Sequence, residues 1–385
     1  MVKFAIALSG GPDSWALALM AQEQDLDFIA LTVDHKLRPE STAEAQQVAT
    51  ECTKRGIKHE TLTWQHDGVT SRIQERARNA RYELLLDYCK NNDIPALLTA
   101  HHADDQAETI LMRIAKASGV KGLAGLRPVT EREGITIVRP LLQYTKRQLV
   151  DYVIAKGVPF VKDPGNESSR YARGRLRGAV DVLAAEGLTP VTLQKFADKM
   201  RDTDAALDEV TAQLVLQHVE RTNPCVVQLQ AGYLRRVPHI IQQRALVDIW
   251  RRVTGGNTYA PGPEALQTVL GNITSKQTCG GMVIEPFENT LRFYRELQAV
   301  EGDVTIPARN EAVWDRRFRI INSGAVPVTV GALGDVSTAA LEKACPWAAA
   351  IRPVAARATL PALGNRPLPL GKDADSGVYA MAQGM

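Results

Sequence analysis

Short apolar runs alternate with amphipathic segments over the first 165 residues. The apolar runs predict strands at Phe4–Leu8, Asp27–Val33, His59–Leu62 and Ala96–Thr99. Helical patterns begin near Ser14 and Ser41 and continue through Arg72–Lys90. This alternation predicts an α/β fold with a doubly wound, Rossmann-like parallel sheet. Ligands of such sheets lie beyond the carboxyl ends of the strands, where strand order reverses, so we expect functional residues in loops that follow strands.

The second half of the chain shows other patterns. Apolar positions recur at spacings of three, four or seven from about Thr189 to Glu220, which predicts one long amphipathic helix. Helical segments follow to about Leu270, and the alternation at Leu291–Arg295 predicts a hairpin. A tail richer in proline and alanine follows Glu301. We therefore expect a catalytic domain at 1–188, a mostly helical second domain at 189–300 and a small mixed C-terminal domain at 301–385, whose end could be disordered.

Composition narrows the class of protein. Hydrophobic residues make up 45% of the chain, enough for two or three cores, but polar residues interrupt every apolar run before the ~20 residues of a membrane span. The chain enters a glycine turn directly after Leu8, unlike a signal peptide, so we expect a cytoplasmic protein. Five widely spaced cysteines form no Cys-x-x-Cys pair, which predicts neither a disulfide framework nor a zinc site.

Basic residues are concentrated locally. The formal net charge of +3 is too small to indicate nucleic-acid binding by itself. Residues 170–177 contain four arginines without an acid, and residues 235–252 contain five arginines against Asp248 alone. Such clusters can neutralise a phosphate backbone, although a solvated basic face explains each cluster equally well.

The segment Ser9-Gly10-Gly11-Pro12-Asp13-Ser14 lies between the first predicted strand and helix. Its glycines permit backbone conformations in which successive amides point at one anion, and the following helix adds its positive dipole end. Ser9 and Ser14 can donate hydroxyls to a pyrophosphate, and Asp13 can orient the loop or a magnesium ion. A tight turn capped by Ser14 is the alternative, which the six matched residues in this context disfavour. The segment lacks the Gly-Lys-Ser/Thr of the Walker sequence and resembles the PP-loop of N-type ATP pyrophosphatases, which cleave ATP to AMP and pyrophosphate.

Two further segments carry candidate residues beside this loop. Asp34 and His35 follow the second strand, although turn or capping roles are common for such residues. Arg78 and Arg81 are three residues apart and share one helical face, so they could clamp a phosphate, or form an exposed salt-bridged face.

Acidic residues gather after the fourth strand. Asp104, Asp105 and Glu108 stand at a helix start, where close carboxylates repel one another unless a cation offsets them. Magnesium is the expected cation, because it favours a few carboxylates together with substrate oxygens. A zinc site with His101 and His102, or simple stabilisation of the helix dipole, are the alternatives.

Together these blocks resemble tRNA(Ile)-lysidine synthases in order and spacing over about residues 1–180. In addition to the segments above, the resemblance is carried by Gly119, Gly122–Gly125, Arg139-Pro140-Leu141, Asp163-Pro164, Asn166 and Tyr171. One departure is that Lys116-Ala117 occupies places where the family often has Arg-Gly. A different PP-loop enzyme, such as a tRNA thiolase or a small-molecule amidating ligase, and an RNA-binding protein with a dead catalytic site are the alternatives.

The resemblance implies a reaction and its participants. Such enzymes use ATP and free lysine to convert the wobble cytidine of tRNA(Ile) with a CAU anticodon to lysidine. The resemblance also implies that Ser9–Ser14 and His35 bind ATP. It implies that Asp105 and Glu108 hold Mg²⁺ or bind lysine, and that the reaction centre contains Asp34, Arg81 and Arg173. The expected tRNA-binding residues are Arg78, Arg175, Arg177, Arg235 and Arg236, and a homodimer is compatible with the sequence.

Overall fold

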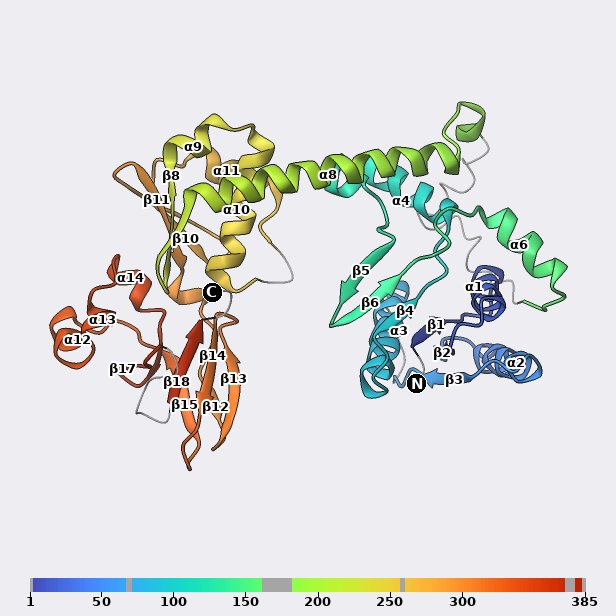
Figure 1. The fold of residues 1–385 in the computed structure, drawn as a ribbon, viewed down its shortest axis with the longest axis horizontal. Helices are drawn as coiled ribbons and strands as arrows, with labels where there is room; N and C mark the ends of the chain where they lie inside the picture. The colour runs from blue at the N-terminus through green and yellow to red at the C-terminus, as the bar shows by residue number, and fades with distance from the viewer. Residues whose placement is uncertain (1–2, 67–70, 161–181, 257–259, 371–377, 383–385) are drawn as a thin grey trace. The chain divides into compact units, whose positions relative to one another are not determined.

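The computed structural model describes residues 3–66, 71–160, 182–256, 260–370 and 378–382. The chain divides into two compact units, Met1–Asp204 and Ala205–Met385. None of the helices in these ranges is long and apolar enough to cross a membrane. Figure 1 labels the helices and strands of both units.

A six-stranded sheet in the order β3-β2-β1-β4-β6-β5 forms the centre of the first unit. Its parallel strands are β1 (Phe4–Ala7), β2 (Phe28–Asp34), β3 (His59–Thr63), β4 (Ala96–Leu98) and β6 (Ile135–Val138). The chain runs from β1 to β2 and β3 on one side and then places β4 on the other side of β1. The strand order therefore reverses at β1, which confirms the expected doubly wound fold.

One edge of the sheet differs from the parallel pattern. Strand β5 (Val129–Arg132) pairs antiparallel with β6. It escapes sequence analysis because none of its four residues is buried, so the strand carries no apolar run.

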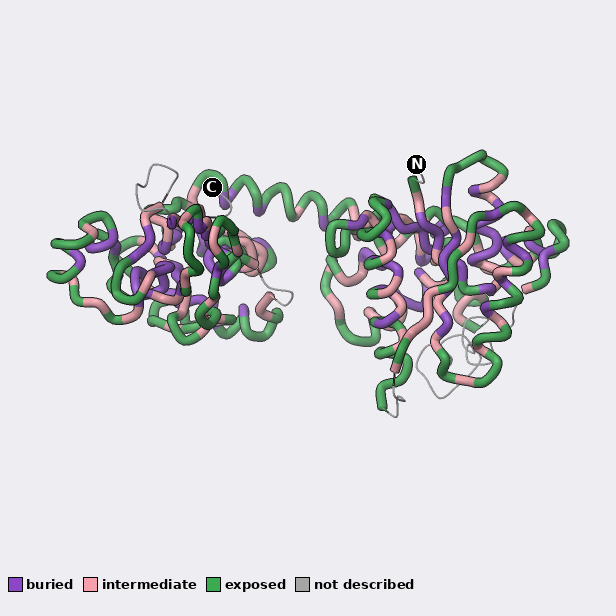
Figure 2. Tube along the Cα trace, turned by 90° about the horizontal axis from the view of Figure 1, so that it is seen from below, coloured by how far each residue is buried: buried purple, intermediate pink, exposed green. Residues whose placement is uncertain are grey.

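Helices cover both faces of the sheet. On one face, α1 (Pro12–Glu23), α2 (Ser41–Lys54) and α6 (Lys146–Ala155) share an apolar cluster with β1. On the other face, α3 (Ile73–Asn91) packs through Leu85 and Leu86. The short helix α5 (Val120–Leu123) follows α4 (Ala103–Ala115), which packs through Ile110 against Leu193 of α8 (Pro190–His218). Figure 2 shows the buried residues running through the interior of this layered arrangement.

The second unit begins within α8, whose bounds confirm the long helix expected from the sequence. Three helices, α9 (Ala231–Arg236), α10 (His239–Thr254) and α11 (Pro263–Gly271), accompany an antiparallel sheet in the order β7-β8-β11-β10-β9. Its strands are β7 (Val219–Asn223), β8 (Val226–Gln230), β9 (Gln277–Cys279), β10 (Met282–Phe287) and β11 (Thr290–Arg295). The predicted hairpin is β10–β11, whereas β7 and β8 were not expected, so this region is less helical than its sequence suggests.

The remaining residues form two small antiparallel sheets, β12-β15-β16-β17 and β13-β14-β18. The strands are β12 (Val304–Ile306), β13 (Asn310–Trp314), β14 (Phe318–Asn322), β15 (Val328–Ala332), β16 (Pro361–Leu363), β17 (Arg366–Pro367) and β18 (Val378–Ala382). The helical elements are the 3-10 turn η2 (Leu297–Ala299), α12 (Thr338–Ala344), α13 (Pro346–Ala349) and α14 (Val354–Arg357).

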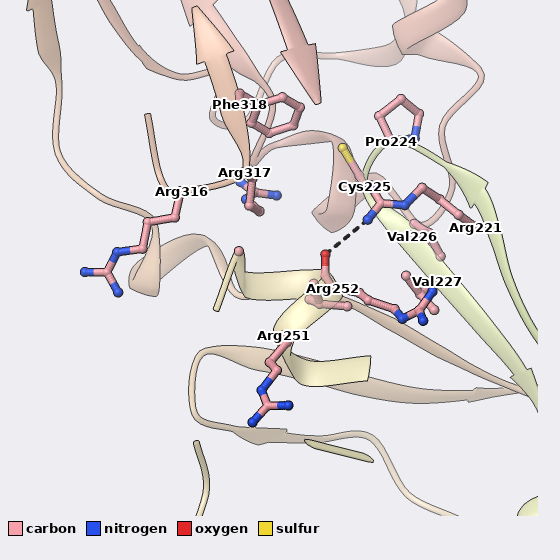
Figure 3. A pocket seen from close by; sticks show the side chains of 12 residues that line it. Arg221, Pro224, Cys225, Val226, Val227, Arg251, Arg252, Arg316, Arg317 and Phe318 are labelled. Carbon is pink, nitrogen blue, oxygen red and sulfur yellow. Dashed lines mark hydrogen bonds between the residues drawn. The ribbon is translucent and has the colours of Figure 1, made fainter. Parts of the chain in front are cut away.

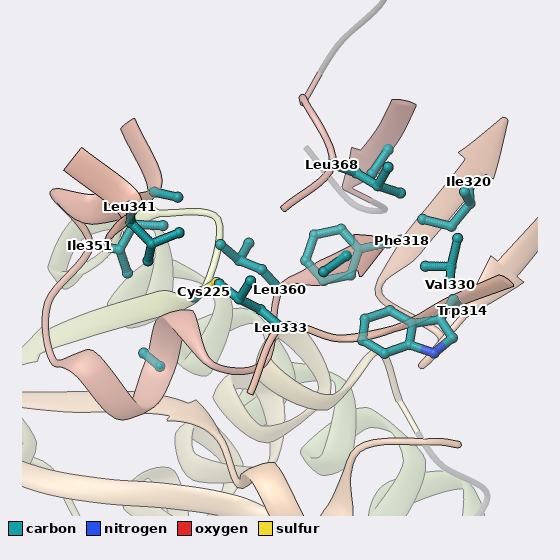
Figure 4. Packing of buried hydrophobic residues seen from close by; sticks show 14 of the residues in the cluster. Cys225, Trp314, Phe318, Ile320, Val330, Leu333, Leu341, Ile351, Leu360 and Leu368 are labelled. Carbon is teal, nitrogen blue, oxygen red and sulfur yellow. The ribbon is translucent and has the colours of Figure 1, made fainter. Parts of the chain in front are cut away.

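These sheets share a core with the strands before them. Trp314 and Phe318 pack in one cluster that also contains Cys225, Val226 and Tyr294 (Figure 4). The expected boundary between residues 300 and 301 falls in the link between β11 and β12, and the division into three domains stays a prediction.

Candidate active site

The glycine loop after β1 has the conformation expected of an anion cradle. Gly10 has φ 82°, a left-handed conformation that glycine adopts without steric cost, and Gly11 precedes α1 as its N-cap. The hydroxyl of Ser14 donates to the carbonyl of Gly11 at 2.9 Å and accepts from the amide of Ser9 at 3.2 Å. This brace closes the loop over the first turn of α1, whose amides have no carbonyl partners within the helix. Residues 9–14 therefore lie at the N-terminus of α1, where backbone donors and the helix dipole suit an anion, and their binding of pyrophosphate stays a prediction.

His102 joins this loop to the loop that follows β4. Its ring nitrogens lie 3.6 Å from Asp13, 3.4 Å from Asp104 and 3.5 Å from Asp105. Burial alone lowers the pKa of His102, but hydrogen bonds to Asp104 and Asp13 and the charge of Asp105 outweigh it and raise the pKa to about 10. His102 is therefore an imidazolium at neutral pH. The buried imidazolium of His102 therefore holds together the loop after β1 and the loop after β4, the two strands between which strand order reverses.

The acids of α4 have different partners. Asp104 accepts a hydrogen bond from the amide of Lys146 at 2.7 Å and so anchors the start of α6. Asp105 accepts a hydrogen bond from the amide of His102 at 3.2 Å at the start of α4, and Glu108 is buried one turn further on. The described residues contain no group of three or more side chains arranged to hold a metal, so the zinc alternative has no support there. A magnesium ion needs fewer protein ligands, and the buried Oδ1 of Asp13, which lacks a hydrogen-bond partner among the described residues, fits such an ion.

The carboxylate of Asp34 braces the turn between β2 and α2. It accepts hydrogen bonds from the hydroxyl of Thr42 at 2.7 Å, from the hydroxyl of Ser41 and from the amide of Lys36 at 3.0 Å. Burial acts to raise the pKa of Asp34, but the bonds from Ser41 and Thr42 prevail and leave its pKa below the usual value. These contacts give Asp34 a positioning role, and its predicted role in the reaction centre is not tested by them.

His35 lies beside Asp34 and faces Trp64 edge-on, with ring centroids 6.1 Å apart. Burial lowers the pKa of His35, and the charge of Arg81 lowers it further. The ring is therefore neutral near pH 7, and its buried Nδ1 has no hydrogen-bond partner among the described residues. A neutral imidazole with an unpaired nitrogen suits the predicted contact with ATP.

Two arginines of α3 and one that directly follows β6 act on His101 at the same edge of the sheet. Burial lowers the pKa of His101 to about 4, and although Asp105 opposes this, Arg139, Arg81 and Arg78 reinforce it. Arg78 and Arg81 also lie over the ring of the buried Tyr82, at 5.3 and 5.6 Å from its centroid. Arg139 was not assigned a role from the sequence, yet its buried Nε lacks a partner among the described residues. Arg78 and Arg81 thus lie close enough to His101 to lower its pKa, and their roles in the reaction and in tRNA binding stay predictions.

The other predicted basic residues are placed differently. Arg173, Arg175 and Arg177 lie outside the described residues. Arg235 and Arg236 are exposed on α9 in the second unit. Beside them, the exposed Tyr233 stacks on His218 with ring centroids 3.5 Å apart, and Arg236 lies 5.8 Å from the Tyr233 ring. Exposed aromatic rings next to arginines are typical of surfaces that stack nucleic-acid bases.

None of the five cysteines provides a reactive thiol. Cys52, Cys89 and Cys225 are buried, and burial raises their pKa to about 12, 11 and 11. Cys279 and Cys345 are partly buried, and burial raises their pKa as well. The thiolate is the nucleophilic form of cysteine, so these environments disfavour thiol chemistry.

Comparison with known proteins identifies relatives of both units. The profile of the PP-loop domain family matches residues 1–182. The tRNA(Ile)-lysidine synthase of Methylobacterium nodulans is 42% identical over 281 residues, which cover 72% of this chain and 83% of that protein. The tRNA(Ile)-lysidine synthase of Ruegeria pomeroyi is 36% identical over 368 residues, which cover 94% of this chain and 86% of that protein. Because 368 residues exceed the length of the first unit, the similarity extends into the second.

Proposed function

The chain belongs to the tRNA(Ile)-lysidine synthase family, and from this premise we propose that it joins free lysine to the wobble cytidine of a CAU-anticodon tRNA(Ile), using ATP. It is thus a ligase that forms a carbon–nitrogen bond and binds ATP through its PP-loop domain. The observation that carries the proposal is the 36% identity to a lysidine synthase over 94% of the chain. A cytoplasmic location and a homodimeric state remain predictions.

The reaction has two steps in this proposal. The carbonyl oxygen of the cytosine attacks the α-phosphorus of ATP, forming a phosphorus–oxygen bond as pyrophosphate leaves. The ε-amine of lysine then attacks the activated carbon, and AMP leaves with the oxygen. The amine arrives protonated, with a reference pKa of about 10.4, so the protein must accept a proton or depress that pKa. Both steps require the base and the amine to be held together in a dry site.

The residues after β1 receive the leaving group. The amides of the first turn of α1 are the proposed donors for pyrophosphate. The hydroxyls of Ser9 and Ser14 keep the loop closed, because Ser9 Oγ donates to Ser14 Oγ at 3.2 Å. His102 fixes this cradle against α4 through Asp13 and Asp105. The positions of the cradle and of the acids on α4 are therefore set by one residue.

Mg²⁺ is proposed to be held by Asp105 and Glu108, with Oδ1 of Asp13 facing the same loop. When bound, the ion neutralises the charge that develops on the departing phosphates. Arg81 and Arg78 add positive charge beside His101, where they can contact a phosphate of ATP or of the RNA. Their effect on His101 in the loop after β4 supports the predicted contacts.

The second unit offers a surface for the remainder of the tRNA. Arg235 and Arg236 have no acidic partner among the described residues, whereas Arg244 and Arg252 pair with Asp208 and Asp248. Positive charge left without a partner can release counterions from RNA. Arg235 and Arg236, together with Arg175 and Arg177, are therefore proposed to bind the phosphate backbone of the tRNA.

One assay tests the whole proposal. The protein is incubated with ATP, labelled lysine and a tRNA(Ile) transcript, and a matched transcript with uridine at the wobble position serves as the control. We expect lysine to enter only the cytidine transcript, with one AMP released per lysine. Incorporation of sulfur, or pyrophosphate release at the same rate without RNA, would contradict the proposal.

Variants separate the roles of the acids. Asp105→Asn and Glu108→Gln are expected to reduce kcat at least a hundredfold, because each removes charge from the proposed metal site. Asp151→Asn on the exposed face of α6 is the matched control and should leave kcat within twofold of the parent. Equal kcat values for Glu108→Gln and the control would remove Glu108 from the site.

A further inference from the structure

A pocket in the second unit is lined by five arginines from three separate segments of the chain. It has a volume of about 270 Å³ and is formed by β7, the end of α10 and the turn between β13 and β14 (Figure 3). The five side chains are Arg221, Arg251, Arg252, Arg316 and Arg317. No acidic side chain lines it among the residues that the structure describes. We call it the arginine pocket.

Nearby acids neutralise only part of this charge. Arg252 pairs with Asp248 at 2.6 Å, Arg316 with Glu301 at 3.1 Å and Arg317 with Asp315 at 2.6 Å. Within the described ranges, no carboxylate forms an ion pair with the two remaining arginines, Arg221 and Arg251. The pocket therefore keeps about two positive charges of its own.

Arg221 is held inside this cluster. Its Nη2 donates to the carbonyl oxygen of Arg252 at 3.2 Å, and Figure 3 shows the guanidinium reaching across to the end of α10. The side chain keeps an exposed edge, yet burial of its charged end lowers its pKa, and the neighbouring charge of Arg252 lowers it further. Like charges gathered in one place are unfavourable unless an anion compensates them.

The walls of the pocket are fixed to each other by backbone contact. Gly255 caps α10 with φ 76°, and a Cβ at that position would lie 2.5 Å from the carbonyl oxygen of Arg316. The opposite wall is the turn at Asp315 and Arg316, whose φ values of 46° and 56° are unusual for residues other than glycine. The buried carboxylate of Asp315 holds this turn by accepting hydrogen bonds from Arg295, Arg317 and the amide of Glu301. The arginines are thus positioned by the strained turn at Asp315 and Arg316 and by the close approach of Gly255 to the backbone of Arg316.

We propose that the arginine pocket binds a phosphate group, with the sugar-phosphate backbone of RNA as its source. Guanidinium groups recognise phosphate oxygens in paired hydrogen bonds, and several arginines around a single concave site suit one tetrahedral anion. Arg221, Arg251 and Arg316 all have exposed surface, so a phosphate that is part of a polymer can reach them. The identification of that polymer as the tRNA substrate rests on the proposed function.

The test compares two double variants of the full chain. Arg221→Gln with Arg251→Gln removes the two charges that lack acidic partners. Arg319→Gln with Arg366→Gln removes two exposed arginines of the same unit that lie outside the pocket. Affinity for the tRNA transcript is measured at several salt concentrations, and affinities for inorganic phosphate and pyrophosphate are measured by calorimetry.

We expect the pocket variant to bind tRNA about tenfold more weakly than the parent, and the slope of log affinity against log salt to fall by about 0.7 to 0.9. The control variant should change affinity less than threefold. Weaker binding of phosphate or pyrophosphate, with tRNA affinity unchanged, would assign the pocket to a small phosphate compound instead of the RNA backbone. Unchanged binding of all three probes, or equal losses in both variants, would overturn the proposal.

The binding test does not require catalysis. If the parent protein bound tRNA through the pocket but incorporated no lysine, the proposed function would fail and the pocket would stand. If lysine were incorporated and the pocket variant bound every probe normally, only the pocket would fail. Far-ultraviolet circular dichroism and the thermal transition of both variants establish that any loss of binding does not come from unfolding.

Discussion

Replacing Ala117 by glycine is expected to stabilise the first unit. Helix α4 ends at Ala115, and the chain then turns through Ala117, which has φ 50°. The amide of Ala117 donates to the carbonyl of Ile114 at 2.9 Å, and the amide of Ser118 donates to that of Arg113 at 2.9 Å. These two bonds form a Schellman motif, in which the left-handed position strongly favours glycine. Ala117 stands where the family often has the glycine of Arg-Gly.

The magnitude follows from two opposing terms. A residue with a Cβ loses about 1–2 kcal/mol in the left-handed conformation. Against this, glycine lowers the free energy of unfolding by about 0.4–1 kcal/mol, because it makes the unfolded chain more flexible. Ala117 is exposed, so its methyl group contributes little burial. The net expectation for Ala117→Gly is a gain of about 0.5–1 kcal/mol, or ~1–4 °C in the transition of a unit of this size.

Ala115→Gly is the matched control, because the same methyl group is removed from an exposed position two residues earlier, at the last residue of α4. It should destabilise the unit by about 1 kcal/mol. Unfolding is followed by circular dichroism in urea, and the transition of the first unit is identified by its shift on adding ATP. If Ala117→Gly lowered stability, or if both substitutions had the same sign, the reasoning would be refuted.

Three other residues give further predictions. His102→Gln should lower the unfolding free energy of the first unit by about 3 kcal/mol, because Asp13, Asp104 and Asp105 lose a shared buried cation. The loss is measured by urea unfolding, and a value below ~0.5 kcal/mol would contradict this. Ser14→Ala should raise the KM for ATP about tenfold, because the hydrogen bonds of the Ser14 hydroxyl that brace the loop are lost. An unchanged KM in pyrophosphate-release assays would show that the loop closes without the Ser14 hydroxyl. Burial lowers the pKa of His59, so the stability it contributes is complete above the unfolded pKa of about 6.5 and is lost as the pH falls toward the folded pKa. Urea unfolding at pH 7.5 and 5.5 should therefore show a smaller pH effect in His59→Gln than in the parent, and equal effects would argue against it.

Strands β1 to β4 of the first unit could be predicted because each apolar run is short and is bounded by a turn, whereas β5 and β6 were missed. The segment at 9–14 indicates an anion site because two glycines stand between a strand and the start of a helix. The role of His102 could not be predicted in this way. Its partner Asp13 is 89 positions away, and only the reversal of strand order brings the two loops together. The sequence does show two adjacent histidines, His101 and His102, before the acids of α4. Their spacing alone does not show which of the two rings faces the interior.

The arginine pocket illustrates a second limit. Arg251 and Arg252 belong to a cluster visible in the sequence, whereas Arg221 joins them from strand β7 and Arg316 joins them from the turn between β13 and β14. Strand β7 has no buried residue, so nothing in its periodicity indicated a strand. Long-range pairing, not local preference, decided both the sheet and the pocket.

The core shared by β8, β11 and the C-terminal sheets affects how the chain can be divided. Cys225, Val226 and Tyr294 belong to the same cluster as Trp314 and Phe318. A chain ending near residue 300 would therefore leave these three apolar side chains in water and would remove the partner strands that cover them. The last 85 residues act as a cover that the preceding sheet needs in order to fold cooperatively, and shortened versions are expected to aggregate instead of retaining RNA affinity.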